Sequence, residues 1–183
     1  MTELLATFPV LHTQRLDLIE INEHHQPDLF NLFTDQRVTA FYHVIPLKEV
    51  ADVQKVVAFL RQRFNDKLGV RWGIALKGQQ EIIGTIGFNS FTHGHKGVMV
   101  FALMPEYWRK GYITEAMQEV IQYGLSALAL KRIEAEVLPG NIASEKVLEK
   151  SGFKQEGLLR EWMVWNGESY DINMYALLKR DLP

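Results

Sequence analysis

The hydrophobic positions of this chain recur with two different periods. Four segments have the apolar alternation, or the β-branched and aromatic composition, of strands: 15–21, 70–76, 81–91 and 97–104. Three others carry apolar residues at the spacing of a helix: 24–35, 48–66 and 113–128. The pattern predicts a first strand, two helices, an antiparallel three-stranded meander and then a long helix.

The last third of the chain adds a strand, a short helix and a hairpin. Residues 131–138 are typical of a strand and 141–150 of a helix, which Ser151-Gly152-Phe153 ends as in a Schellman motif. Asn166-Gly167 is a strong hairpin signal between two final strands. Because 99–137 has the pattern strand–helix–strand, its strands are predicted to be parallel in a right-handed crossover. The fold class is α+β, with a mostly antiparallel sheet and one parallel pair.

Composition excludes several classes of function. Hydrophobic residues make up 47% of the 183 residues and charged residues 23%, with a net charge of −2. The chain therefore fits a single globular domain, 1–183, without the basic face that nucleic-acid binding needs. Cysteine is absent, which excludes disulfides and zinc–cysteine sites, and no apolar run approaches the roughly 18 residues of a membrane span. We expect a cytoplasmic protein that binds neither nucleic acid nor membrane.

The sequence YWRKGYITEAMQEV joins a short basic stretch to the start of the long helix. Gly111 leaves the loop free of side-chain obstruction, so the first N–H groups of the helix are open to an anionic ligand such as a phosphate. Arg109 and Lys110 add positive charge. The alternative is that Gly111 only forms a tight turn. Since neither GxxxxGK[ST] nor GxGxxG occurs, the sequence predicts a pyrophosphate site of another type.

Four segments that cover nearly the whole chain resemble the GNAT acetyltransferases. They are HTQRLDL (12–18), LMPEYWRKGYITEA (103–116), LPGNIASEKVLEKSGFKQEG (138–157) and LLREWMVWNGESYDINMYALLKR (158–180). Within that family they are most similar to the Rim-type (RimJ/RimL-like) ribosomal-protein N-terminal acetyltransferases. The resemblance implies the GNAT fold, with a splayed parallel strand pair and about four helices, and acetyl-CoA as co-substrate.

The resemblance also implies which residues hold acetyl-CoA. The pantetheine arm is expected to bond to the strand at Ala102, Leu103 and Met104, with Asn141 and Ser144 beside it. The pyrophosphate is expected on the backbone of the loop and first helical turn, formed by Arg109, Lys110, Gly111, Tyr112, Ile113 and Thr114. Ile113 stands where the family usually has a small residue, but a cradle made of backbone groups should survive that change.

The implied reaction is direct attack of a neutral amine on the acetyl thioester, with no covalent enzyme intermediate. Ser144 stands where Rim-type enzymes carry a serine proposed to protonate the departing CoA thiolate. The usual general bases are missing, because Val98 and Met163 occupy the positions of the two glutamates that relatives use.

Three side chains remain as candidate bases. They are Glu136 on the strand before Asn141, His43 in the aromatic loop 41–46, and Glu161, which shares a strand face with Met163 if no bulge intervenes. For each of them the alternative is an ordinary solvated or ion-paired side chain.

The acceptor pocket is expected between the first two helices, with Phe41, Tyr42, His43 and Trp162 in its walls. The Rim-type resemblance favours the N-terminal α-amine of a protein or peptide as acceptor. The alternatives are a small-molecule amine such as an antibiotic, polyamine or amino acid, a non-catalytic acyl-CoA-binding protein, and an interaction module with a degenerate cofactor site. The histidine spacing suggests no metal site, and a homodimer is left open.

Overall fold

The computed structural model describes residues 5–42 and 47–182 and contains one mixed sheet of eight strands. The strands are β1 (Leu11–His12), β2 (Leu16–Glu20), β3 (Val70–Leu76), β4 (Ile82–Thr92), β5 (Lys96–Leu103), β6 (Arg132–Val137), β7 (Lys154–Trp165) and β8 (Glu168–Leu178). Their order across the sheet is β1-β2-β3-β4-β5-β6-β8-β7. Among the described strands, β5 and β6 form the one parallel pair, as the sequence predicts.

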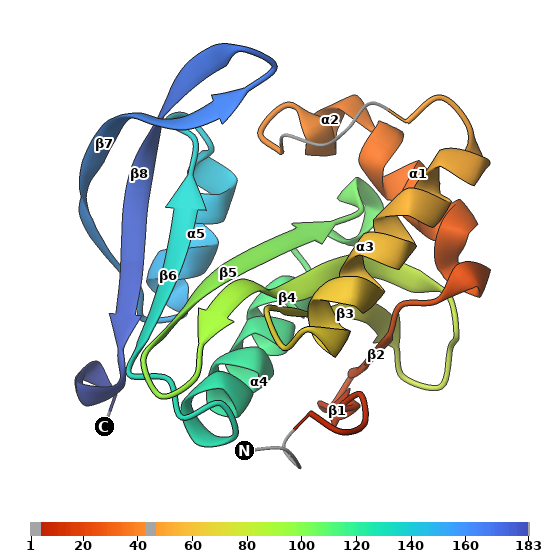
Figure 1. Cartoon of the computed structure of the whole chain (residues 1–183), viewed down its shortest axis with the longest axis horizontal. Helices are drawn as coiled ribbons and strands as arrows, with labels where there is room; N and C mark the ends of the chain where they lie inside the picture. The colour runs from red at the N-terminus through yellow and green to blue at the C-terminus, as the bar shows by residue number, and fades with distance from the viewer. Residues whose placement is uncertain (1–4, 43–46, 183) are drawn as a thin grey trace.

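Helices cover both faces of this sheet. They are α1 (Gln26–Thr34), α2 (Gln36–Thr39), α3 (Val53–Asn65), α4 (Tyr112–Ser126) and α5 (Ile142–Lys150), with short 3₁₀ turns at Glu23–His25, Val50–Asp52, Pro105–Tyr107 and Lys179–Asp181. The first three helices lie on one face, and α4 and α5 lie on the other (Figure 1). Within the described ranges, the helices are too short or too polar to cross a membrane.

The two faces of the sheet have separate hydrophobic cores. The larger core lies under α4, whose stripe Met117, Val120 and Ile121 packs against the sheet around Trp72, a fully buried side chain. The smaller core joins α1, α2 and α3 to the other face, and it includes Leu29, Val57 and Ala102. Side chains alternate along a strand. The residues directly before and after one in the α4 core therefore point their side chains toward α1–α3.

One predicted helix differs in its first residues, and an unpredicted short helix follows it. The segment 24–35 is a 3₁₀ turn followed by α1, and α1 ends at Asp35, which has an extended backbone (φ −70°, ψ 117°). The Asp35 side chain accepts a hydrogen bond from the N–H of Arg37 and caps α2, so a second short helix begins there. The predicted strand 70–76 coincides with β3, whereas the two-residue strand β1 was not predicted.

The two predicted chain reversals are confirmed. Gly152 has φ +90°, its N–H donates to Glu149 O, and Phe153 N–H donates to Leu148 O, which is the bond pattern of a Schellman motif. Asn166 and Gly167 both have positive φ values, +50° and +82°, as the tight turn between β7 and β8 requires.

Candidate functional site

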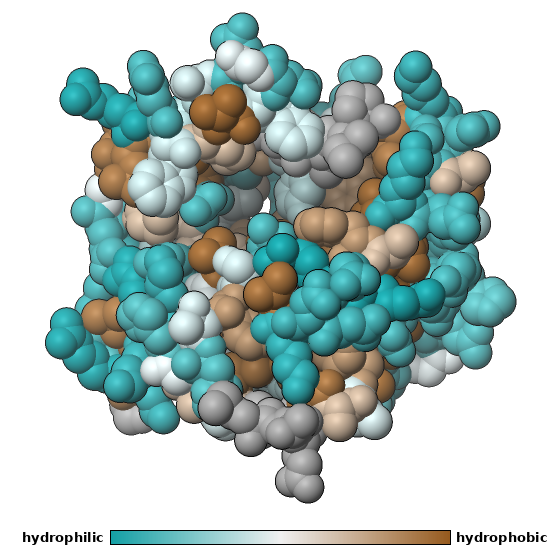
Figure 2. Space-filling model, in the orientation of Figure 1, coloured by the Kyte–Doolittle hydropathy of each residue, from teal (hydrophilic) through white to brown (hydrophobic). Residues whose placement is uncertain are grey.

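The sheet opens between its two parallel strands. Backbone pairing of β5 with β6 runs from Lys96–Arg132 to Met99–Ala135 and stops there, although both strands continue. The strands then diverge, which divides the sheet into β1–β5 and β6–β8 (Figure 1). At the closed end, Lys96 Nζ donates to Glu134 Oε2 across the pair at 2.8 Å. The predicted splayed strand pair is therefore present. On the face of the molecule shown in Figure 2, a recess lies between the two halves of the sheet.

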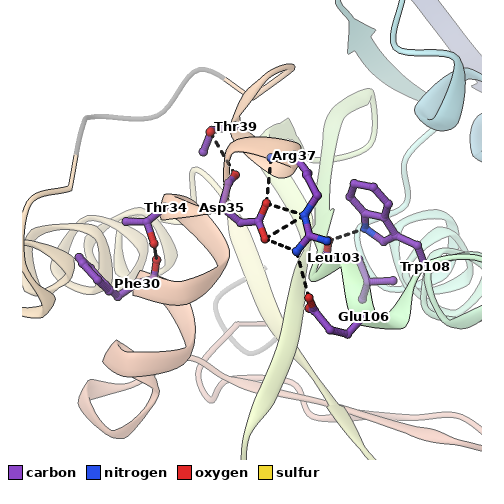
Figure 3. Close-up of polar contacts among 8 residues, drawn as sticks. All are labelled: Phe30, Thr34, Asp35, Arg37, Thr39, Leu103, Glu106 and Trp108. Carbon is purple, nitrogen blue, oxygen red and sulfur yellow. Dashed lines mark hydrogen bonds and ion pairs between the residues drawn. The ribbon is translucent and has the colours of Figure 1, made fainter.

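The open edge of β5 presents backbone groups to the gap. Met104 N–H donates to Ile83 O on β4 at 2.9 Å, so in this antiparallel pair Phe101 and Leu103 point their N–H and C=O groups away from β4. The Leu103 carbonyl accepts from Trp108 Nε1 at 2.6 Å (Figure 3). A strand-like ligand in the gap can therefore bond to Phe101 and to Leu103 N–H, whereas the N–H of Met104 is already used.

The loop that follows β5 is shaped for an anion. Arg109 and Gly111 have left-handed backbone conformations, with φ +61° and +79°, and Lys110 between them does not. Such alternation turns successive N–H groups toward one concave surface. Gly111 is the N-cap of α4 and the first intrahelical bond is from Glu115 N–H to Gly111 O, so the N–H groups of the three residues before Glu115 lie ahead of it. In the described structure no side chain caps them.

A half-buried carboxylate in the first turn of α4 ties this loop to a distant part of the chain. Glu115 accepts from Thr13 Oγ1 at 2.6 Å and from Arg15 N at 2.8 Å, and it pairs with Arg15 Nε at 2.6 Å. Arg15 Nη1 also donates to Lys110 O at 3.0 Å, and its guanidinium lies 4.6 Å from the centre of the Tyr112 ring. Burial pushes the pKa of Glu115 upward, but the hydrogen bonds from Thr13 and Arg15 outweigh it, and the pKa lies below its usual range.

This bracing was not predicted, although the sequence held one signal for it. Thr13 and Arg15 belong to the HTQRLDL segment, which resembles the Rim-type enzymes. The half-buried side chain of Ile113 packs against the α4 core. A backbone cradle is thus free of the branched side chain at that position.

The start of α5 faces the same gap. Asn141 Oδ1 accepts from Ser144 N–H at 3.2 Å, which makes Asn141 the N-cap and leaves the half-buried Ser144 hydroxyl outside the cap. Gly140, just before it, has φ +91°, and a Cβ built there would lie 3.9 Å from Phe41 Cε1. Phe41 follows α2, so the two halves of the molecule approach one another at this point.

Glu136 lies where the gap begins. It directly follows Ala135, the last residue of β6 paired with β5. Ala135 and Val137 belong to the α4 core, so the Glu136 side chain lies on the opposite face of the sheet. Its exposed side chain is therefore on the α1–α3 face, and its Oε1 accepts from Trp162 Nε1 at 3.1 Å. Two of the residues predicted for the site, Glu136 and Trp162, are brought together.

Glu161 was expected to share a strand face with Met163 only if no bulge lies between them, and a bulge is present. The β7–β8 pairing shifts between Leu159 and Met163, and Glu161 within this bulge has φ +51° and donates its N–H to Asp171 Oδ1 at 2.8 Å. The simple alternation that would put Glu161 and Met163 on one face is therefore broken. His43, the third candidate base, falls outside the described residues.

The wall predicted from the aromatic loop is partly described. The Tyr42 ring stacks on Phe33 of α1 with 5.4 Å between ring centres, and its hydroxyl accepts from Arg71 Nη1 at 3.0 Å. On the same side, Arg37 of α2 pairs with Asp35 and also with Glu106, in the 3₁₀ turn after β5, at 3.0 Å (Figure 3). Helix α2 is thus tied to the 3₁₀ turn that leads into the loop 108–111.

The geometry fits a CoA thioester. The gap offers unpaired strand groups for an amide-bearing arm. The loop at Gly111 offers backbone N–H groups that no side chain of Gly111 obstructs, and an added Cβ there would come within 3.3 Å of Arg15 Nη2. Within the described residues, no cluster of three or more histidine, aspartate or glutamate side chains has the arrangement of a metal site.

Known proteins are similar to this chain in sequence and in fold. Residues 15–154 match the family described as acetyltransferase (GNAT) domain. The chain is 36% identical over 173 residues to the uncharacterized N-acetyltransferase YoaA of Bacillus subtilis, which covers 94% of this chain and 98% of YoaA. It is 28% identical over 105 residues to the ribosomal protein uS5-alanine N-acetyltransferase of Escherichia coli, over 56% and 54% of the two chains. The structure of RimL, the ribosomal L7/L12 alpha-N-protein acetyltransferase, in complex with coenzyme A superimposes with a TM-score of 0.81 at 18% identity, covering 93% and 98% of the chains.

Proposed function

The chain belongs to the GNAT family of acetyl-CoA-dependent N-acetyltransferases, and we propose that its acceptor is the α-amine at the N-terminus of a polypeptide. The observation that best supports this reaction is that β5 and β6 diverge after Met99 and Ala135, next to the start of α4, which no side chain caps. A gap of this kind aligns an extended thioester, and the helix start favours its phosphates.

In the proposed reaction the amine nitrogen forms a bond to the acetyl carbon, and the bond from that carbon to the CoA sulfur breaks. The free N–H groups on the open edge of β5 are suited to the oxygen that gains negative charge. The amine proton leaves toward Glu136, directly or through water, and the Ser144 hydroxyl gives a proton to the thiolate. Glu136 is the favoured base, because it lies at the start of the gap with Trp162 as its hydrogen-bond donor.

The lack of a carboxylate base at positions 98 and 163 favours an α-amine as the acceptor. An α-amino group has a pKa near 7.7–8.0 and a lysine side chain one near 10.4, so a lysine costs about 3–4 kcal/mol more to deprotonate at neutral pH. Val98 and Met163 provide no carboxylate where relatives have one. A partly neutral acceptor suits such a site, and the uS5-alanine and RimL enzymes named above act on protein N-termini.

The test is acetylation of two matched peptides, followed by mass spectrometry. One has a free N-terminus and no lysine; the other has a blocked N-terminus and one internal lysine. We expect kcat/KM for the first to exceed that for the second by more than about tenfold, given the difference in amine pKa. Equal or faster acetylation of the lysine peptide would contradict the α-amine assignment. Failure with both peptides but turnover of small amines would move the acceptor to the small-molecule class.

A further inference from the structure

Arg71 on β3 has a charge that no carboxylate of the described residues balances. Its Nη1 donates to the Tyr42 hydroxyl, but its Nε is buried and has no hydrogen-bond partner. In the described part of the chain, none of the carboxylates forms an ion pair with it. A buried donor without a partner is costly, and a guanidinium without a counterion more so.

A second orphaned group lies on the same face of the sheet. Thr85 on β4 is only 1% exposed, and its Oγ1 also has no partner among the described residues. Val70, Trp72 and Ile86 point into the α4 core, so Arg71 and Thr85 both point to the α1–α3 face. Since the Tyr42 oxygen already accepts from Arg71, its O–H remains free to donate. Three donors with unused capacity therefore lie on the same face of the sheet.

A water molecule does not resolve this arrangement. A cavity of about 10 Å³ borders Arg71 between Leu60 and Gly69, about the smallest volume that holds one water. Such a water could bond to Nε, but it carries no charge and leaves the guanidinium without a counterion. The donor set is that of a site for a carboxylate, which accepts several hydrogen bonds at once.

The position of Arg71 relates this site to the acetyl transfer. Arg71 pairs with Gly87, and Gly87 pairs with Val100, the first residue of β5 beyond the last β5–β6 pair. Glu136 occupies the corresponding place across the gap, on the same face. With adjacent strands about 4.8 Å apart, the Arg71 backbone lies about 10 Å from that of Val100. This separation suits a carboxylate several bonds away from the reacting amine.

We propose that Arg71, with Tyr42 and Thr85, binds a carboxylate of the acceptor, so that the enzyme prefers polypeptide N-termini with an acidic side chain at the first or second residue. This inference rests on the proposed function, since it specifies the acceptor of the same site. The shared chemistry is a carboxylate near a primary amine, which a free amino acid also carries on its α-carbon.

The experiment compares peptides that differ by one charge. C-terminally amidated decapeptides that begin Ala-Asp or Asp-Ala are compared with otherwise identical peptides that begin Ala-Asn or Asn-Ala. Free aspartate, free alanine and the amides of both are assayed in the same way. We expect kcat/KM to favour an acidic peptide over its amide twin by at least about tenfold, as when a charged hydrogen-bond partner is restored. Arg71→Gln should bring that ratio close to one. Arg61→Gln, which alters an arginine of α3 that is ion-paired with Glu23 at the surface, should leave it unchanged.

Two gentler variants guard against a failure of Arg71→Gln to fold. Tyr42→Phe keeps the ring on Phe33 and Thr85→Val keeps the shape, and each should lower the ratio in part. Efficient acetylation of all peptides without an acidic preference would overturn the carboxylate site and leave the proposed function standing. Arg71-dependent turnover of free amino acids alone would keep the carboxylate site and refute the polypeptide acceptor.

Discussion

Arg15 Nε lies 2.6 Å from Glu115 Oε2, which joins the turn between β1 and β2 to the first turn of α4, 100 residues later. The same guanidinium holds the Lys110 carbonyl, so one side chain fixes both the helix start and the loop before it. A loop that is held in place before the ligand arrives needs less ordering on binding, which favours affinity.

Removing this brace should weaken acetyl-CoA binding. Arg15→Ala loses two charge-assisted contacts, and we expect the Kd for acetyl-CoA, measured by calorimetry, to rise by about threefold to tenfold. Arg61→Ala is the matched control, because it removes a surface ion pair with Glu23 that is remote from the loop. An unchanged Kd in Arg15→Ala would mean that the loop holds its shape without the brace.

The same carboxylate should contribute a pH-dependent part of the stability. The folded-state pKa of Glu115 lies below its usual value of 4.5, so its contribution is complete above about pH 4.5 and is lost as pH falls through the folded pKa. The difference in unfolding free energy between wild type and Glu115→Gln should therefore shrink between pH 7 and pH 3. Urea denaturation at both values measures it, with Glu119→Gln on the same helix as control. A difference that stays constant would contradict an ionised, hydrogen-bonded Glu115.

Gly111 and Gly78 allow backbone strain to be separated from ligand binding. Both have left-handed conformations, with φ +79° and +75°, so a valine at either position costs about 1–2 kcal/mol of stability. Only Gly111 lies in the predicted pyrophosphate loop. We expect acetyl-CoA to raise the Tm of wild type and Gly78→Val but not of Gly111→Val. An intact shift in Gly111→Val would place the phosphates elsewhere.

Two tryptophans should affect different kinetic constants. Trp108→Phe removes the donor to Leu103 O at the open edge of β5, so we expect a higher KM for acetyl-CoA. Trp162→Phe removes the donor to Glu136, so we expect kcat to fall, with acetyl-CoA KM little changed. Steady-state kinetics across pH separates the two. Equal effects on both constants in both variants would refute this division.

Ser144 can be tested without disturbing its helix. The cap uses the N–H of Ser144 and the side chain of Asn141, so Ser144→Ala keeps the cap, whereas Asn141→Ala removes it at a cost of about 1 kcal/mol. If the hydroxyl protonates the thiolate, kcat should fall by about 10²-fold or more in Ser144→Ala with acetyl-CoA Kd nearly intact. Parallel losses of binding and turnover would make Ser144 a ground-state contact. Ser126→Ala on α4 serves as the control.

Local sequence signals predicted those parts of the structure that depend on neighbours in the chain. The hairpin at Asn166-Gly167 and the helix end at Gly152 follow from residues that accept a left-handed backbone, a property of the residue itself. The stripe of α4 and the alternation in β3 follow from periods that a buried face imposes. The short helix α2 after Asp35 escaped prediction, because its four residues are too few to show a helical period.

The family resemblance predicts that 102–104, 109–114 and 141–144 contact the ligand, and these roles remain predictions. What the sequence by itself determined is the α+β class, the parallel crossover and the glycine at the start of α4. Only the tertiary structure decided which side chains meet: Glu115 with Arg15, Glu136 with Trp162, and Arg71 with Tyr42 but with no carboxylate among the described residues. Such pairs join segments that are far apart in the chain, and their distances follow from strand order, register and bulges, which no local period encodes.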